Sequence, residues 1–311
     1  MKSYHESVML SETVDWLTHE RQRGGVFVDA TLGGGGHAEG LLLAHSEARV
    51  IGIDQDDEAI RHASERLARF GERFRAVHAN FRELADYLKG VELAGVVMDL
   101  GVSSHQLDHP DRGFSFMRDG LLDMRMDRRG ELTAADVLNC CSEKEIARIL
   151  WDLGEERASR RIARRVVEFR KNRPIRRTAE LADLVMGVVY RPPHRRGSHP
   201  ATNTFRALRM MVNDEMGALK DGLLAAWSHL ARGGRLAVIS FHSMEDRLVK
   251  QQFRHWAGED EGGRLLTRKP LEPDEEETLC NARARSAKLR VIEKCGSEKK
   301  QEILEEKENG A

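Results

Sequence analysis

The sequence predicts an α/β fold in which a parallel sheet is interrupted by an inserted helical domain. Four short apolar runs rich in β-forming residues alternate with helix-patterned stretches, at 26–31, 49–54, 74–80 and 93–100. This alternation is typical of βαβ units with right-handed crossovers, and therefore of a doubly wound parallel sheet. The pattern then stops, because residues 108–203 contain no convincing strand, and it resumes after 204.

Helix signals define the insertion and the second part of the sheet domain. Ser142 and Glu145 form a capping box, which opens a helix that we expect to reach about Lys171. A helix of about 25 residues is expected from near Thr204, followed by a strand at 234–240 and a helix from about Ser243.

Two further candidate strands lie at 264–269 and 287–294. They lack the long crossover that parallel pairing needs, so we expect an antiparallel pair at the sheet edge. The expected domains follow: a sheet domain with a first part at 1–107 and a second part at 204–296, a helical insert at 108–203, and a charged, disordered tail at 297–311.

Composition limits the class of protein. A chain of 311 residues can bury a large core, and no apolar run approaches the roughly 20 residues that a membrane span needs. The N-terminal residues lack a signal-peptide pattern, so we expect a cytoplasmic protein without a membrane partner. Its four cysteines form no C-x-x-C pair, and neither a metal site nor a disulfide framework is indicated.

The charge distribution points to a nucleic acid. The formal net charge is -1, but residues 157–209 hold fifteen Lys or Arg against three acids. A local charge of +12 is typical of a phosphate-binding face, although a basic run alone is more often a solvated helix face. Phosphate attraction does not distinguish RNA from DNA.

A glycine-rich loop follows the first predicted strand. Gly33 to Gly36 let the backbone approach a ligand, and Asp54 ends the second strand eighteen residues later, where a carboxylate can hold ribose hydroxyls. The loop also fits the dinucleotide pattern G-x-G-x-x-A, so a nicotinamide-dependent oxidoreductase is one alternative. A glycine turn with capping acids is another.

Two more acids favour S-adenosylmethionine as the cofactor. Asp29 lies just before the loop, where it can orient the loop or hold a ligand ammonium, and Asp99 ends the fourth strand. A carboxylate-rich cleft suits a sulfonium and an α-amino group better than a pyrophosphate. Methyl transfer to an exocyclic amine depends on positioning more than on a strong base, and Asp99 is the candidate catalytic group near that reaction.

Several long motifs carry a family resemblance. They are GGGGH (33–37), DLGVSSHQLD (99–108), GFSFMRDGLLDMRM (113–126), HPATNTFRALRMMVNDE (199–215) and ISFHSMEDRLVK (239–250). In colinear order and over nearly the whole chain to Lys294, the sequence resembles the bacterial MraW/RsmH family. The resemblance implies a class I (Rossmann-like) S-adenosylmethionine methyltransferase fold. It also implies methylation of N4 of a cytosine in the decoding region of 16S ribosomal RNA.

The resemblance also implies a set of cofactor contacts. They are Gly35, Gly36, His37, Asp54, Phe81, Asp99 and Gln106, and Gly34 of the same loop is a further candidate contact. A cofactor contact and an acceptor for the amine are different roles, and both stay open for Asp99. The amino-methyltransferase tetrad, a polar residue followed by Pro-Pro-aromatic, is absent, because DLGV occupies that place. Whether methyl transfer follows the mechanism of enzymes with that tetrad therefore stays open.

The substrate side is expected to bind RNA. A base inside a duplex cannot be reached, so the target must be single-stranded or flipped into a pocket. The substrate candidates at predicted strand and helix ends are Ser103, Ser104, Asn203, Thr204, Arg206, Phe241, His242 and Ser243. Taken singly, His242 is more often structural and Phe241 more often a core residue. Tyr190, His194 and His199 accompany the basic run.

The expected partner is 16S ribosomal RNA, within the small ribosomal subunit. An RNA-binding assembly factor with a vestigial cofactor site is the alternative outside the enzyme classes. The sequence leaves the oligomeric state open.

Overall fold

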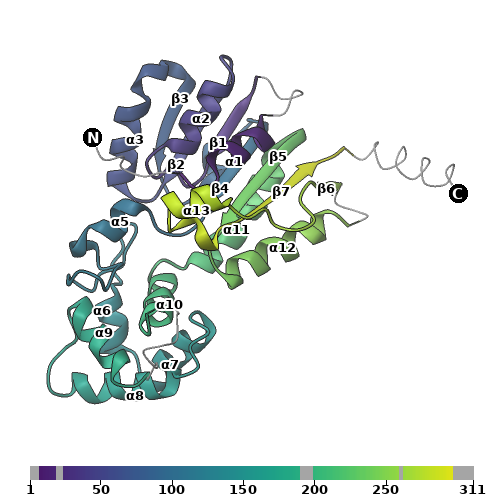
Figure 1. Cartoon of the computed structure of the whole chain (residues 1–311). Coiled ribbons are helices and arrows are strands. Elements are labelled where there is room, and N and C mark those ends of the chain that lie inside the picture. Colours follow the sequence, from purple (N-terminus) through teal and green to yellow (C-terminus); the bar gives the residue numbers. More distant parts are fainter. Residues whose placement is uncertain (1–6, 19–23, 190–198, 259–261, 297–311) are drawn as a thin grey trace, which may run out of the picture. The chain divides into compact units, whose positions relative to one another are not determined.

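The computed structural model describes residues 7–18, 24–189, 199–258 and 262–296. The chain divides into two units. Figure 1 shows the whole chain, coloured by residue number from purple to yellow. Unit 1 comprises Met1–Gly101 and Gly217–Ala311, and unit 2 comprises Val102–Met216. The unit boundaries therefore lie at 101 and 217, whereas the sequence placed the insert at 108–203. The tail expected at 297–311 lies outside the described residues.

Unit 1 is built on a seven-stranded sheet in the order β3-β2-β1-β4-β5-β7-β6. Its strands are β1 Val26–Asp29, β2 Arg49–Asp54, β3 Phe74–His78, β4 Leu93–Asp99, β5 Leu230–Ser240, β6 Gly263–Leu265 and β7 Lys288–Lys294. The first five pair in parallel, and β7 pairs antiparallel with both β5 and β6. The Rossmann-like sheet and the antiparallel edge expected from the missing crossover are both confirmed.

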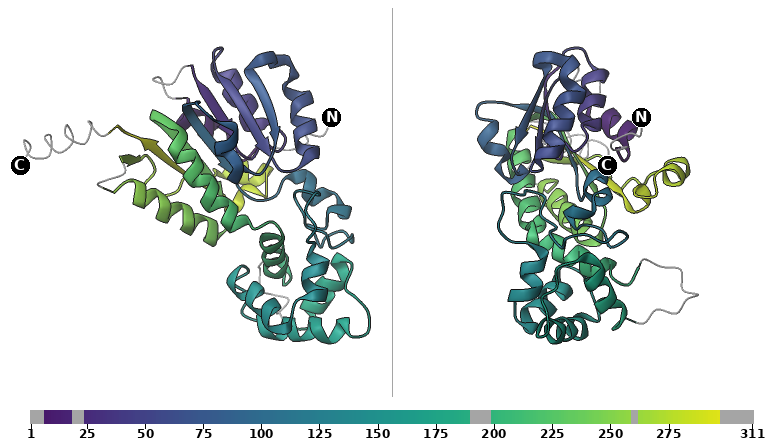
Figure 2. Two further views of the ribbon diagram at one scale, coloured as in Figure 1. Left: turned by 180° about the vertical axis from the view of Figure 1, so that it is seen from behind. Right: turned by 90° about the vertical axis from the view of Figure 1, so that its left-hand side faces the viewer.

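Helices cover both faces of this sheet, as two views in Figure 2 show. They are α1 Leu10–Leu17, α2 Gly36–Ala44, α3 Asp57–Leu67, α4 Leu84–Tyr87, α11 Glu215–His229 and α12 Ser243–Trp256. A further short helix of unit 1, α13 Glu275–Cys280, has no buried residue. Alternate residues of a strand point to opposite faces. Phe27 accordingly packs in the core cluster of α1 and α2, and Val28 in the cluster of α11 and α12. Burial on both faces explains the nearly continuous apolar strands.

Unit 2 is helical around one core cluster. Its helices are α5 Ser104–Asp108, α6 Ala134–Cys140, α7 Glu143–Asp152, α8 Ser159–Arg170, α9 Thr178–Met186 and α10 Thr202–Val212. The capping box of Ser142 and Glu145 is present at the start of α7, as predicted. The unit contains no named strand in its described residues, which agrees with the sequence pattern.

The prediction of one helix from Ser142 to about Lys171 was wrong. The helix ends at Asp152, and α8 begins seven residues later, because Gly154 and Glu155 form a turn in which Glu155 has a φ of 51°. A Cβ atom on Gly154 would lie 2.6 Å from the carbonyl oxygen of Leu150, so the turn requires glycine.

The helix of about 25 residues expected from Thr204 is also two helices. The break lies at Asn213 and Asp214, where Asp214 has a φ of 44°. The Asn213 amide donates to the carbonyl of Met124 at 2.8 Å and accepts from the N–H of Met126 at 2.7 Å. These tertiary hydrogen bonds stabilise a helix end that the continuous apolar periodicity concealed.

Replacing Gly120 by alanine is expected to destabilise unit 2 by about 3 kcal/mol or more. An added Cβ atom would lie 1.7 Å from the carbonyl oxygen of Pro110, and Gly120 also exchanges two 3.0 Å hydrogen bonds with Thr178. Urea unfolding measures the loss. Gly130→Ala is the control, because its nearest contact would be 3.4 Å. Equal effects of the two substitutions would contradict this explanation.

Candidate cofactor site and nucleic-acid face

The glycine-rich loop joins β1 to α2 in a backbone conformation that glycine favours. Gly33 has a φ of 48° and Gly35 a φ of 76°, and Gly35 is the N-cap of α2. The Gly34 carbonyl accepts a 3.0 Å hydrogen bond from the Arg66 guanidinium. A Cβ atom on Gly36 would lie 2.0 Å from Ser7 Oγ, so residue 7 packs directly against the loop. The loop predicted from sequence is therefore formed, with Ser7 against it.

Asp29 holds the two ends of this loop together. Its carboxylate is fully buried and accepts the N–H of Thr31 at 3.3 Å and the N–H of Ala38 at 3.1 Å. Burial raises the pKa of Asp29 to about 7, against the opposing effect of these two donors. Of the two roles that the sequence left open for Asp29, the structure shows the orienting one.

Asp54 lies at the end of β2, beside the loop. Its carboxylate accepts the N–H of Gly33 at 2.8 Å and the N–H of Asp56 at 2.9 Å. Burial raises the pKa of Asp54 to about 6. A carboxylate has about four acceptor positions, so Asp54 keeps capacity for the hydroxyl groups of a ribose.

Asp99 ends β4 at the same edge of the sheet. Its Oδ1 is buried and has no hydrogen-bond partner among the residues that the structure describes. Its Oδ2 lies 3.8 Å from His37 Nδ1, and its backbone N–H donates to Thr31 Oγ1 at 2.6 Å. Burial, followed by the charges of Asp29, Glu245 and Glu277, raises the pKa of Asp99 well above its usual range. A buried acceptor without a donor is costly alone, and it fits a ligand that carries N–H groups or positive charge.

His37 connects Asp99 to the start of the chain. The ring is 3% exposed, and its Nε2 lies 3.1 Å from the carbonyl oxygen of Val8. A carbonyl oxygen only accepts, so Nε2 donates its proton to Val8. Nδ1 faces Asp99 Oδ2, and the two groups attract each other when one further proton is held by either of them. His37 therefore fixes the position of Val8 relative to the loop and lies next to Asp99.

Phe81 follows β3 in the short helical turn Phe81–Glu83. Its half-buried ring packs against Gly222 of α11, where an added Cβ atom would lie 2.4 Å from the ring. The glycine makes room for the aromatic side chain next to the sheet edge. This position suits the predicted contact with adenine.

Gln106, the remaining predicted cofactor contact, belongs to unit 2. It forms a capping box with Ser103 at the start of α5: its Oε1 accepts the N–H of Ser103 at 3.0 Å, and Ser103 Oγ accepts the N–H of Gln106 at 3.2 Å. Ser104 is the first residue of that helix. Gln106 and Ser103 thus have a structural role within unit 2.

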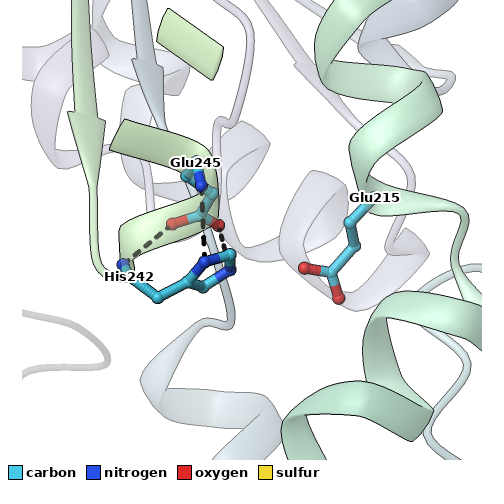
Figure 3. A group of neighbouring side chains, drawn as sticks. All are labelled: Glu215, His242 and Glu245. Atoms are coloured by element: carbon cyan, nitrogen blue, oxygen red, sulfur yellow. Dashed lines mark hydrogen bonds and ion pairs between the residues drawn. The ribbon is translucent and has the colours of Figure 1, made fainter. Parts of the chain in front are cut away.

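Phe241, His242 and Ser243 form the turn from β5 into α12, and Figure 3 shows the hydrogen bonds between His242 and Glu245. Glu245 Oε2 accepts the N–H groups of Phe241 at 2.9 Å and His242 at 3.2 Å, and His242 Nδ1 accepts the N–H of Glu245 at 3.4 Å. His242 is therefore the N-cap of α12, which is the structural role expected of an isolated histidine at this position. Figure 3 also draws Glu215, which pairs with Arg209 in unit 2 at 2.7 Å.

Unit 2 has a pocket of about 720 Å³, and the structure brings two predicted substrate residues to it. Its lining residues are Trp151, Asp152, Glu155, Arg157, Asn203 and Arg206. Arg206 also donates to the carbonyl of Gly154 at 2.7 Å, which holds the turn between α7 and α8. Thr204, in contrast, is buried and lines no part of this pocket.

Trp151 was not predicted from the sequence, whereas Arg157 is the first residue of the predicted basic run. The Trp151 side chain is 58% exposed, which is unusual for a tryptophan in a helix. An apolar residue at a position where α7 otherwise faces solvent is the signal that would have identified it.

The helix α8 presents one basic face. Ile162, Ala163 and Val166 are buried, and the exposed arginines of the helix are Arg160, Arg161, Arg164 and Arg165. His199 stacks on Phe116 with ring centroids 4.4 Å apart, and the other residues that accompany the basic run, Tyr190 and His194, lie outside the described residues. Within the described part of the chain, no helix is long and apolar enough to cross a membrane.

Comparison with known proteins identifies the family. The model of the MraW methylase family matches residues 2–295. The chain belongs to the MraW methylase family. Proteins named ribosomal RNA small subunit methyltransferase H are 47% identical in Carboxydothermus hydrogenoformans, over 94% of this chain and 99% of that one, and 47% identical in a Geobacter species, over 94% and 98%.

A solved structure of a putative rRNA methylase from Clostridium thermocellum is similar over 93% of this chain and 98% of that one. The identity is 14% and the TM-score is 0.46.

Membership in the MraW methylase family decides between the cofactors left open by the glycine pattern. S-adenosylmethionine is the cofactor, and the dinucleotide alternative is excluded. The residues fit this cofactor: the positive-φ glycines form a cradle, Asp54 keeps acceptor capacity, and Asp99 Oδ1 is a buried acceptor that needs a donor or a positive charge.

The affinity for S-adenosylmethionine is expected to rise with pH more steeply than that for S-adenosylhomocysteine. The pKa of Asp54 is raised to about 6 and that of Asp29 to about 7, so these two carboxyl groups gain negative charge between pH 5.5 and 8, and burial raises the pKa of Asp99 as well. The sulfonium is a cation and the thioether is neutral, so the affinity ratio should change by about tenfold. Calorimetric titrations across this range test it, and identical pH profiles for the two ligands would contradict it.

Proposed function

We propose that this MraW methylase transfers a methyl group from S-adenosylmethionine to the N4 amine of a cytosine in 16S ribosomal RNA, within the small ribosomal subunit in the cytoplasm. The observation that carries the proposal is the buried Oδ1 of Asp99 at the carboxyl end of β4, beside the glycine-rich loop. This oxygen has no hydrogen-bond partner within the described part of the chain. The names of the relatives, ribosomal RNA small subunit methyltransferase H, support the substrate class.

The cofactor would be held by residues that follow or end three strands of unit 1, β1, β2 and β3. The backbone of Gly34, Gly35 and Gly36 would approach the methionine part, and Asp54 would accept hydrogen bonds from the ribose. Phe81 would flank the adenine. The bound cofactor supplies an electrophilic methyl carbon.

Asp99 would accept hydrogen bonds from the cytosine amine. The lone pair of the cytosine amine is delocalised into the ring, and a carboxylate that accepts its N–H hydrogen bonds favours the pyramidal, nucleophilic form. The methylated nitrogen then loses a proton readily, so no strong base is required. Most of the rate would come from holding the amine roughly 3 Å from the methyl carbon. His37, 3.8 Å away, would keep Asp99 in position.

Unit 2 would bind the RNA. Trp151 offers an exposed aromatic face on which a base can stack, and Arg157 supplies a charge for phosphate in the same pocket. The four exposed arginines of α8, a helix that begins two residues after Arg157, would supply further charge for phosphate. Such a surface would hold the nucleotides that flank a base taken out of its stack.

The experiment compares substrates. Wild-type protein is incubated with methyl-labelled S-adenosylmethionine and small subunits from cells that lack the modification, with large subunits as the control. Label only in the small subunit is expected. Measurable cofactor binding with no transfer to small subunits or naked 16S RNA would overturn the proposal in favour of an RNA-binding assembly factor.

A further inference from the structure

The N-terminal turn, residues 7–9, packs on the glycine-rich loop at two successive positions. Ser7 occupies the space beside Gly36, where a Cβ atom would be 2.0 Å from its Oγ. The carbonyl oxygen of the next residue, Val8, accepts from His37 at 3.1 Å. The position of this turn therefore determines the position of His37, whose Nδ1 lies 3.8 Å from Asp99 Oδ2.

Met9 holds this turn in an unfavourable backbone conformation. Its φ is 50°, which is the left-handed region, and its residue exposure is 1%. Met9 is the N-cap of α1, but its side chain cannot accept the hydrogen bond that such a position normally supplies. A non-glycine residue keeps this conformation only where surrounding contacts enforce it.

One enforcing contact comes from the far end of the chain. The backbone N–H of Met9 donates to Glu277 Oε1 at 2.7 Å, across 268 residues of sequence. Glu277 is placed by the short helix α13, whose N-cap Asp274 accepts the Glu277 N–H at 2.7 Å. A short hydrogen bond to an ionised carboxylate is among the stronger kinds in proteins.

The helix α13 contributes little packing of its own. None of its residues is buried, and Leu279 is 85% exposed. Burial of apolar surface therefore does not explain why this helix lies against the N-terminal turn. The hydrogen bond from the Met9 N–H to Glu277 explains this position.

From these contacts we infer that Glu277 is a positioning residue of the cofactor site, which holds the N-terminal turn against the glycine-rich loop and thereby sets His37 and Asp99. The connection runs from Glu277 through Met9 and Val8 to His37 and then to Asp99. The segment after β6 is accordingly part of the cofactor site. This inference rests on the use of S-adenosylmethionine and not on the identity of the RNA.

The test measures cofactor affinity without RNA, by calorimetry on the full chain. Glu277→Ala removes the acceptor and should weaken both S-adenosylmethionine and S-adenosylhomocysteine by about tenfold or more, which is about 1.4 kcal/mol. Glu277→Gln keeps a neutral acceptor and should recover part of that affinity. Glu276→Ala is the matched control, because Glu276 is exposed on the same helix, and it should bind both ligands like wild type.

Hydrogen exchange of the Met9 amide separates a positioning role from a merely structural one. Protection of this amide should fall in Glu277→Ala and largely persist in Glu277→Gln, in parallel with affinity. Loss of protection with unchanged affinity would overturn the inference, as would equal losses in Glu276→Ala. If Glu277→Ala does not fold, a Glu277→Gln protein with wild-type affinity for both ligands and a fully exchanging Met9 amide would overturn it.

The results that would overturn the inference on Glu277 differ from those that would overturn the proposed function. Failure of wild-type protein to bind S-adenosylmethionine would overturn the proposed function. A wild-type protein that binds the cofactor but methylates no ribosomal RNA would leave the inference on Glu277 intact.

Discussion

Asp99→Asn is expected to lower the affinity for S-adenosylmethionine and the rate of methyl transfer together, by about 10²- to 10³-fold in kcat/KM. The amide keeps the shape of the side chain but loses the negative charge that faces the cofactor. Its buried Oδ1 has no hydrogen-bond partner in the described structure, so the ligand is the group that would satisfy it. Calorimetry and single-turnover transfer assays measure the two losses.

The same substitution is expected to stabilise the cofactor-free protein at pH 7, by about 1–3 kcal/mol. The folded-state pKa of Asp99 is raised above its unfolded value, so the folded protein binds more protons. The stabilising contribution of the Asp99 carboxyl is therefore fully present below its unfolded-state pKa, and it is lost as the pH rises toward its folded-state pKa. Asp99→Asn cannot ionise, so this variant does not lose that free energy of unfolding. Active-site groups often lower the stability of a folded protein in this way.

Asp123→Asn is the matched control for stability. The pKa of Asp123 is lowered, because its carboxylate pairs with Arg125 at 2.7 Å, which outweighs its burial. Neutralising it should destabilise the protein at pH 7. Thermal unfolding that shows destabilisation by both substitutions would contradict the proposed electrostatics of Asp99.

Neutralising the basic face of α8 is expected to weaken RNA binding by about 10²-fold or more at low salt, with little change in cofactor affinity. The variant replaces four exposed arginines by alanine, at 160, 161, 164 and 165. Each lost phosphate contact lowers the salt slope of binding to single-stranded RNA by about 0.7, so the total change should approach 3. Filter binding to a 16S RNA fragment over a salt series measures both quantities.

Four exposed arginines of unit 1 provide a control of equal charge, at Arg61, Arg75, Arg254 and Arg268. Their replacement by alanine should change the RNA affinity much less. If both quadruple variants lose affinity equally, the RNA is attracted by overall charge rather than by α8. An unchanged salt slope in the α8 variant would exclude this face as the binding surface.

The sheet could be predicted from the sequence because local pattern and tertiary structure agree there. Strands buried on both faces are apolar throughout, and β2 begins and ends where the pattern indicated, at Arg49 and Asp54. The antiparallel edge followed from a missing crossover. Helix ends were predicted less well, because the breaks near Gly154 and Asn213 depend on tertiary contacts that leave helical periodicity intact.

The site could be predicted where one local motif contains it. The glycine-rich loop and the acids that end β1, β2 and β4 follow each other in a regular order, so their positions could be inferred before the structure. The role of Glu277 could not be inferred from the sequence, because its partner Met9 lies 268 residues away. Glu245 was missed for a different reason: its capping box begins with His242, a residue that rarely takes the role of cap.

Transfer to the cytosine N4 amine is tested by mass spectrometry of nucleosides from 16S RNA that this protein has methylated with labelled S-adenosylmethionine. We expect label in N4-methylcytidine, at one cytosine of the small-subunit RNA, with wild-type protein and loss of this label with Asp99→Asn. Label on another atom, such as C5 of cytosine or a ribose hydroxyl, would contradict it, as would undiminished N4 label with Asp99→Asn.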